Sequence, residues 1–172
     1  MASERKKLGK IYQDHYKTGI GAEVGCLRGE FSRFLSTQYQ GKILSIDAFI
    51  GEPKIPDDPL TEEKCRKNLE GTKCELIKGL SLDVVKKIDD GSLDWIYIDA
   101  DHEYEAVKAD LEAWFPKVRN GGIISGHDYV KYESEESIFG VIEAVDEFCK
   151  KYGYKIEGLF DVGKFASWYF TK

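Results

Sequence analysis

The sequence predicts an α/β domain built on a doubly wound, mostly parallel sheet of seven strands that ends in an antiparallel hairpin. Short apolar runs alternate with segments of helical periodicity, and the last two runs are joined by a link too short for a crossover helix. A chain of 172 residues, 42% of them hydrophobic, is long enough to bury one such core. We therefore expect a single domain over residues 1–172, with an N-terminal segment at 1–18 and the core at 19–170.

The first five strands are expected where short apolar runs occur. Each run is continuous and is bounded by Gly, Asp or Lys, as in strands that are covered on both faces of a parallel sheet. The runs lie at residues 20–25, 42–47, 73–78, 93–98 and 121–125.

Four helices are expected between and after these strands, because apolar residues recur there every three or four positions. The core-facing sets are Phe31, Phe34 and Leu35; Leu82, Val85 and Ile88; Tyr104, Val107, Leu111 and Trp114; and Ile138, Val141, Ile142, Val145, Phe148, Cys149 and Tyr152. Strands and helices that alternate with short links imply right-handed crossovers.

The end of the chain has a different pattern. Two β-rich runs, at residues 154–159 and 165–170, are separated by only five residues, so these strands should pair antiparallel. Irregular loops are expected at about 49–60 and 129–137. Both loops follow strands at the sheet edge where ligands bind in open α/β folds, so they are candidates for substrate recognition.

Charge and cysteine content narrow the class of protein. The net charge is −6 and no long basic run occurs, so we expect no nucleic-acid partner. The four cysteines are far apart and lack metal or redox spacing, which fits free thiols in a reducing compartment. The first ten residues lack the apolar stretch of a signal peptide, and no run is long enough to span a membrane. We expect a soluble, cytoplasmic domain.

The most informative local pattern is a glycine-rich turn after the first strand. Glu23, Gly25 and Gly29 form E-x-G-x-x-x-G, and Asp47 ends the next strand. This layout brings backbone N–H groups close to a nucleoside, with the second acid on the ribose hydroxyls and Phe49 against the adenine. An acid beside the turn would repel a pyrophosphate but suits a cationic ligand. The alternatives are a plain strand-to-helix turn and an aspartate that starts a loop.

The third strand ends in another candidate contact. Gly79, Leu80 and Ser81 can supply backbone and hydroxyl contacts to a base. Ser81 also has the chemistry of an N-cap for the helix that runs from Leu82, and the two roles can coexist.

Acids and histidines gather after the fourth and fifth strands. Asp99, Asp101, His127 and Asp128 follow neighbouring strands and should converge on a hard or borderline divalent ion. Polar contacts to a ligand amine, or ordinary loop capping, are the alternatives. His102 has the further option of a packed, hydrogen-bonded imidazole at a helix start, and His15 is expected to be structural or solvated.

Taken together, these motifs resemble class I S-adenosylmethionine-dependent methyltransferases. The motifs are AEVGCLRGEFSRFL, ILSIDAF, SLDWIYIDADHEYEAVKADLEAWFPKVRNGGIISGHDY and the terminal hairpin. The chain resembles the small bacterial O-methyltransferase-like family that includes macrolide-sugar and cephalosporin-tailoring enzymes. It is similar, more distantly, to the catechol and caffeoyl-CoA O-methyltransferases. The resemblance implies a Rossmann-like sheet.

The resemblance also implies site residues. The cofactor S-adenosylmethionine would be bound by Glu23, Gly25, Cys26, Gly29, Phe31, Asp47, Ala48, Gly79, Leu80, Ser81, Asp99 and Asp101. Asp99, His127 and Asp128 would be catalytic and would hold a divalent metal such as Mg²⁺, Mn²⁺ or Zn²⁺. Relatives usually have an acid or amide at the position of His127, and an imidazole there favours a zinc- or manganese-like ion. Without a metal, His127 is the best general base.

The implied reaction is methyl transfer to a small-molecule acceptor, with a hydroxyl oxygen and metal assistance as the first hypothesis. The alternatives are metal-independent transfer to nitrogen or another nucleophile, and a non-catalytic cofactor-binding module. A nicotinamide-dependent oxidoreductase is disfavoured because G-x-G-x-x-G is missing. Acceptor specificity is expected to come from the loops at 49–60 and 129–137, the N-terminal segment, or another subunit of a homo-oligomer.

Overall fold

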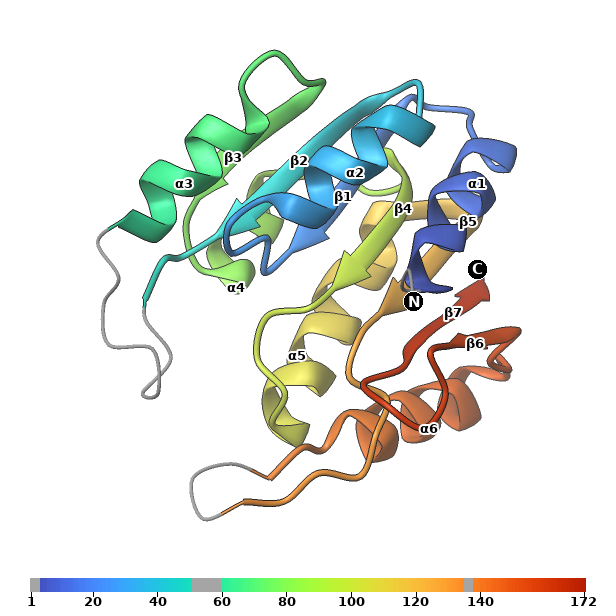
Figure 1. Cartoon of the computed structure of the whole chain (residues 1–172). Coiled ribbons are helices and arrows are strands. Elements are labelled where there is room, and N and C mark those ends of the chain that lie inside the picture. Colours follow the sequence, from blue (N-terminus) through green and yellow to red (C-terminus); the bar gives the residue numbers. More distant parts are fainter. Residues whose placement is uncertain (1–3, 51–59, 135–137) are drawn as a thin grey trace.

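The computed structural model describes residues 4–50, 60–134 and 138–172, and it confirms the predicted fold class. Seven strands form one sheet in the order β3-β2-β1-β4-β5-β7-β6 (Figure 1). β7 pairs antiparallel with both β5 and β6, and the other pairs of neighbours are parallel. The strands are β1 Ile20–Val24, β2 Lys42–Asp47, β3 Cys74–Lys78, β4 Leu93–Ile98, β5 Val118–Gly126, β6 Gly158–Phe160 and β7 Ser167–Thr171.

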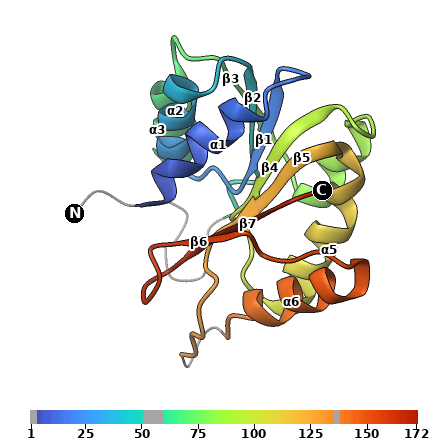
Figure 2. The ribbon, with the colours of Figure 1, turned by 90° about the vertical axis from the view of Figure 1, so that its right-hand side faces the viewer.

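Helices cover both faces of the sheet (Figures 1 and 2). They are α1 Leu8–Asp14, α2 Glu30–Gln38, α3 Leu60–Leu69, α4 Ser81–Val84, α5 Tyr104–Trp114 and α6 Val141–Tyr152, with 3₁₀ turns η1 Glu4–Lys7, η2 Val85–Lys87 and η3 Phe115–Lys117. The larger apolar cluster lies between the sheet and α4, α5 and α6. A second cluster joins α1 and α2 to the opposite face. The apolar runs of β4 and β5 are therefore covered on both sides, as expected for central strands.

Two helices were not predicted. α1 has only seven residues, and half of the ten residues of α3 are charged, so neither shows a clear apolar stripe in the sequence. Leu8 and Tyr12 of α1 are fully buried, and the Tyr12 ring stacks on Trp95 with centroids 4.2 Å apart. Residues of the segment 1–18 thus help to form the core.

Two predicted elements begin later than expected. Gly153 has a left-handed φ of 79° that ends α6, and the N–H of Tyr154 bonds to the carbonyl of Cys149, so the strand predicted at 154–159 begins only at Gly158. The helix predicted from Ile138 begins at Val141 because the chain first passes close to α5. A Cβ on Gly140 would lie 2.4 Å from the Cβ of Tyr104.

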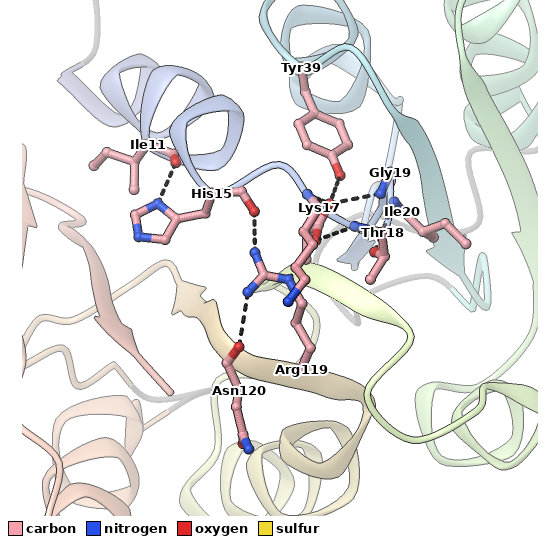
Figure 3. Close-up of polar contacts among 10 residues, drawn as sticks. Ile11, His15, Lys17, Thr18, Gly19, Ile20, Tyr39, Arg119 and Asn120 are labelled. Carbon is pink, nitrogen blue, oxygen red and sulfur yellow. Dashed lines mark hydrogen bonds and ion pairs between the residues drawn. The ribbon is translucent and has the colours of Figure 1, made fainter.

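A buried carboxylate organises the amino end of the sheet. Asp94 in β4 is fully buried and accepts backbone N–H bonds from Lys17 (2.9 Å), Thr18 (2.8 Å) and Gly19 (2.9 Å). The Tyr39 hydroxyl (2.6 Å) and the Arg119 Nε (2.8 Å) complete its shell. Figure 3 shows how these five partners converge. The link between α1 and β1 is thereby fixed to the sheet.

The Arg119 guanidinium extends the same network. It donates to the carbonyls of Asn120 and His15, and the His15 Nδ1 lies 2.9 Å from the carbonyl of Ile11 (Figure 3). His15 therefore caps the end of α1, in agreement with its expected structural role.

Two further observations concern the helices and the cysteines. No helix within the described ranges is long and apolar enough to cross a membrane. Cys26, Cys65, Cys74 and Cys149 are free thiols in the structure.

Candidate active site

The candidate site lies along the edge where the parallel strands end. In register, Val24 of β1 pairs with Ile46 of β2 and with Ile98 of β4, and Ile98 pairs with Gly126 of β5. The next residue of each strand therefore lies on the same edge. As a result, the turns that carry Gly25, Asp47, Asp99 and His127 meet side by side.

The glycine turn is shaped by its neighbours. Gly25 has a left-handed φ of 89°, and a Cβ there would lie 2.0 Å from the backbone oxygen of Asp99. The N–H groups of Gly25 and Cys26 bond to the carbonyl of Ile46 at 2.8 and 3.1 Å. These donors dock the turn onto β2, whereas the sequence pattern suggested that they would face a ligand. The glycine is needed for the close approach of the β1 and β4 turns.

Asp47 holds the same turn through its side chain. Its Oδ2 accepts the N–H of Leu27 at 2.7 Å, and its Oδ1 accepts the N–H of Phe49, also at 2.7 Å. The second bond is the loop-starting role that had been considered as an alternative. Each oxygen retains a lone pair, so the carboxylate can still accept from a ribose diol. The Phe49 side chain packs against the cluster of Cys26, Cys65 and Leu69.

Apolar side chains stay exposed around Asp47. Leu27 is 49% exposed and Leu80, two residues beyond β3, is 53% exposed. The N–H of Gly79 bonds to the carbonyl of Asp47 at 2.9 Å, which places the third turn beside the second. Exposed leucines on two turns that flank a carboxylate suit a nucleoside, with an apolar base and a polar sugar.

Glu23 lies beneath the turn and not on its surface. It is 2% exposed and accepts a short hydrogen bond from the Ser32 hydroxyl, which is 2.6 Å from the Ser45 hydroxyl. Burial raises the pKa of Glu23 to about 8, and the negative charge of Asp99 contributes to the shift. Glu23 is therefore mostly neutral below about pH 8, and above that pH its buried charge can act on a ligand at short range.

Three other predicted cofactor residues have structural surroundings. The Cys26 thiol is buried 3.7 Å from the Sγ of Cys65. The Phe31 ring is buried against Tyr97, with centroids 4.8 Å apart. Gly29 caps α2 with a φ of 70°. These residues shape the turn after β1. Ala48 is half-buried and follows Asp47 in the turn after β2.

The predicted N-cap role of Ser81 is wrong. Leu80 is the N-cap, and Ser81 is the first residue of α4 and makes no capping bond. Its hydroxyl instead donates to Asp110 at 2.5 Å and accepts the indole N–H of Trp114 at 2.8 Å. Burial raises the pKa of Asp110 to about 6. Asp110, which was not predicted as a site residue, ties the third turn to α5.

Two acids and two histidines meet after β4 and β5. The His102 Nε2 lies 2.6 Å from Asp128 Oδ2 and 3.8 Å from Asp99 Oδ1. The His127 Nδ1 lies 3.2 Å from Asp128 Oδ1 and 3.6 Å from Asp99 Oδ1. Asp101 is exposed and accepts the N–H of Glu103 at 2.9 Å, which is the loop-capping alternative.

The residues that suit a metal differ from the predicted set. Ligand atoms of Asp99, His102 and Asp128 all lie within 4.8 Å of one another, so His102 takes the place expected for His127 in this group. The buried Nε2 of His102 has no partner in hydrogen-bond geometry despite its short contact with Asp128. A buried imidazole nitrogen aimed between two carboxylates fits a divalent cation.

The charge state of the cluster sets the pH at which its histidines can ligate a cation, because only a neutral imidazole binds a metal. Burial disfavours imidazolium, but the nearby carboxylates of Asp128 and Asp99 outweigh it and raise the pKa of His102 to about 10. The same acids raise the pKa of His127 to about 9. The two histidines in turn hold the pKa of Asp128 far below its usual range, against the effect of burial. The pair of acids thus attracts positive charge.

Aromatic rings flank the cluster on its outer side. The Phe139 ring stacks on His102 with centroids 4.5 Å apart, and Tyr132 packs on Phe139 at 4.8 Å. A bridge between Glu133 and Ile138 and a bond from the Phe139 N–H to the carbonyl of Tyr132 (2.9 Å) form this arm. Parts of both predicted recognition loops, residues 51–59 and 135–137, lie outside the described residues.

Known proteins share this sequence pattern and this fold. The profile of a family described as a methyltransferase domain matches residues 22–129. A 66-residue stretch is 35% identical to the uncharacterized protein y4gI of Sinorhizobium fredii, and this alignment covers 38% of the chain and only 7% of that protein.

Solved methyltransferase structures superpose on almost the whole chain. A SAM-dependent methyltransferase from Aquifex aeolicus has a TM-score of 0.66 at 18% identity, over 98% of this chain and 89% of that one. A putative caffeoyl-CoA O-methyltransferase from Staphylococcus aureus has a TM-score of 0.70 at 16% identity, over 97% and 80%. An O-methyltransferase from Bacillus cereus in complex with SAH has a TM-score of 0.65 at 20% identity, over 96% and 81%.

The chain belongs to the methyltransferase domain family. Its fold is that of S-adenosylmethionine-dependent methyltransferases.

Proposed function

We propose that this protein transfers the methyl group of S-adenosylmethionine to a hydroxyl oxygen of a small-molecule acceptor, with a divalent cation held by Asp99, His102 and Asp128. One observation carries the proposal: two acids that draw positive charge face two imidazoles at the edge where the nucleoside turns end. The O-methyltransferase from Bacillus cereus, which has the same fold, supports this reaction class.

The chain offers a matching surface for the cofactor. Asp47 would accept from the ribose hydroxyls, and Leu27 and Leu80 would flank the base. Above about pH 8, the ionised Glu23 would favour the cationic end. When bound, S-adenosylmethionine supplies an electrophilic methyl group on a sulfonium. The protein then has to align the acceptor with that group and exclude water.

The acid and histidine cluster would position the acceptor. When bound, a divalent cation lowers the pKa of an acceptor hydroxyl and orients it. The His127 Nδ1 faces Asp128, so Nε2 is the atom that would take the acceptor proton above about pH 9, where the imidazole is neutral. The arm with Tyr132 and Phe139 would form the outer wall of the acceptor site.

Calorimetric titration with S-adenosylhomocysteine, with and without Mg²⁺, Mn²⁺ or Zn²⁺, tests both parts. We expect the wild-type protein to bind S-adenosylhomocysteine and one of these ions. The substitution His102→Ala should weaken ion binding by at least about tenfold, since it removes a ligand. His15→Ala is the matched control, because His15 caps α1 and its ring contacts the carbonyl of Ile11 at 2.9 Å.

The outcomes separate the hypotheses. Failure of the wild type to bind S-adenosylhomocysteine under every condition contradicts the proposed function. Binding of S-adenosylhomocysteine together with turnover that chelators leave unchanged favours the metal-independent reaction, with His127 as the base. Binding without methyl transfer to any acceptor panel favours a cofactor-binding module.

A further inference from the structure

The N-terminal 3₁₀ turn is docked beside the candidate site by a residue from the other end of the chain. Asp161, in the turn between β6 and β7, accepts the N–H of Glu4 at Oδ1 (3.0 Å) and the N–H of Arg5 at Oδ2 (3.1 Å). The Nζ of Lys7 also lies 5.9 Å from the centre of the Phe160 ring. The backbone at Arg5 is therefore fixed by the fold.

The Arg5 side chain reaches from this turn into the site. Its guanidinium lies over the Phe31 ring, 4.7 Å from the centroid, and its Nη1 is 3.9 Å from Asp99 Oδ2. The side chain is 30% exposed. A guanidinium has five N–H donors, so its hydrogen bond to Tyr97 and its contact with Asp99 leave donors for a second anion.

The acids at this edge of the sheet would repel the carboxylate of the cofactor unless a cation such as the Arg5 guanidinium lies beside it. S-adenosylmethionine carries a carboxylate on its methionine end, but the turns here carry acids, among them Asp47 and Asp99. The N–H groups of Gly25 and Cys26 already donate to β2, so they are not available to that carboxylate. A carboxylate placed at this edge needs a positive partner to offset the repulsion.

The proposed nucleoside site sets a direction for the cofactor. The exposed leucines and Asp47 would hold the nucleoside over β2 and β3. The rest of the molecule would then extend over β1 towards β4, where Asp99 and Arg5 lie. Phe31, at the start of α2, supports the guanidinium from below and limits its movement.

We propose that Arg5 binds the methionine carboxylate of S-adenosylmethionine and S-adenosylhomocysteine, so that the docked N-terminal turn is part of the cofactor site. The assignment rests on the proposed function. It makes Arg5 a determinant of specificity for nucleosides that carry an amino-acid tail.

Two ligands isolate the contact. S-adenosylhomocysteine has the amino-acid carboxylate, whereas 5′-methylthioadenosine keeps the adenosine and sulfur but lacks that group. By calorimetry, Arg5→Ala should weaken S-adenosylhomocysteine binding by about 10- to 100-fold, the range for a charge-assisted hydrogen bond, and should leave 5′-methylthioadenosine binding unchanged. Arg5→Lys should recover part of the loss because it keeps the charge.

Lys6→Ala is the matched control. Lys6 lies on the same turn, but its Nζ faces the Phe34 ring at 5.1 Å. It should change neither affinity. If Arg5→Ala does not fold, as judged by its thermal transition, the same two affinities can be compared in Arg5→Gln, which has a longer polar side chain.

Equal losses for the two ligands, or no loss for either, would overturn the assignment of Arg5. So would a selective loss of S-adenosylhomocysteine binding in Arg28→Ala with none in Arg5→Ala, because the clamp would then lie in the glycine turn. Failure of the wild type to bind S-adenosylhomocysteine is a different result, which contradicts the proposed function itself.

Discussion

Two aspartates five positions apart illustrate how differently the two ends of one strand use a negative charge. Asp94, at the start of β4, is fully buried and accepts hydrogen bonds from five donors at 2.6–2.9 Å. Asp99, just after β4, is half-buried, and its ion pairs with His102, His127 and Arg5 span 3.6–3.9 Å.

The donors explain the difference. Three of the donors to Asp94 are backbone N–H groups, which are fixed as soon as the chain folds. Together with Tyr39 and Arg119 they outweigh the effect of burial and hold the pKa of Asp94 far below its usual range. The partners of Asp99 are side chains, which can exchange for a ligand or an ion. A carboxylate whose hydrogen bonds are all made, such as Asp94, stabilises the fold. A carboxylate with longer, exchangeable contacts, such as Asp99, can bind a ligand or an ion.

The largest effect is expected for Asp94→Asn. The change removes the charge opposite Arg119 and places amide N–H donors against backbone donors. Loss of one partner from a buried ion pair costs about 3–5 kcal/mol, which should appear in urea unfolding. The folded fraction should bind S-adenosylhomocysteine within about twofold of wild type, because the two ends of β4 are far enough apart to act independently.

A matched exposed pair controls for the loss of charge alone. Asp14→Asn disrupts the contact with Lys10 at 3.6 Å on the surface of α1, and it should change the free energy of unfolding by no more than about 0.5 kcal/mol. A similar small effect for Asp94→Asn would show that the five hydrogen bonds do not stabilise the fold.

The second-largest effect is expected for Asp99→Asn, which should reduce activity and leave stability almost unchanged. Methyl transfer should fall by about 10²- to 10³-fold, as expected when several kcal/mol of charge stabilisation is lost at the reacting centre. The free energy of unfolding should change by less than about 1 kcal/mol. Single-turnover rates and urea unfolding measure the two quantities. A loss of stability as large as that of Asp94→Asn would make Asp99 a structural acid, and the comparison would fail.

The smallest effect is expected for Glu23. Comparing Glu23 with Asp94 distinguishes the effect of burial on the pKa from the effect of the number of hydrogen-bond donors. Glu23 is as buried as Asp94 but accepts from Ser32, and burial raises its pKa to about 8. Below that pH the carboxyl is mostly neutral, and above it the charge can attract a sulfonium. If the cofactor lowers this pKa by about one unit, affinity for S-adenosylmethionine should rise about tenfold relative to S-adenosylhomocysteine between pH 6 and 9.

Glu23→Gln should remove this pH dependence, as calorimetry with the two ligands at several pH values will show. An equal rise in the variant would assign the effect to titration of the ligand. A fall in the ratio with rising pH in the wild type would contradict the proposed interaction of Glu23 with the sulfonium.

Much of the fold could be predicted because the strands are continuous apolar runs and a short link requires an antiparallel pair. The meeting of Asp99 with His127 and Asp128 followed for the same reason, since each comes directly after one of two adjacent strands. The helix-forming tendency of α1 and α3 was not visible, because their stability comes from packing on the sheet and not from a local stripe.

The parts of the site that were missed depend on contacts distant in sequence. His102 joins the acids because the Phe139 ring packs on it and the Gly140 N–H bonds to its carbonyl at 2.8 Å. Arg5 reaches Asp99 because a residue 156 positions away holds its backbone. No local sequence pattern predicts such contacts. The chain has only three histidines, however, so His102 was one of few candidates for an imidazole ligand.

The bonds from Asp161 to Glu4 and Arg5 also set an order of assembly during synthesis. The N-terminal turn is synthesised before the carboxylate that receives it, which lies between β6 and β7, the last two strands of the sheet in sequence. Closing so long a loop must wait for β6 and β7. A growing chain can therefore complete most of the sheet while its proposed carboxylate clamp is still open, and it becomes competent for the cofactor only after β6 and β7 are made.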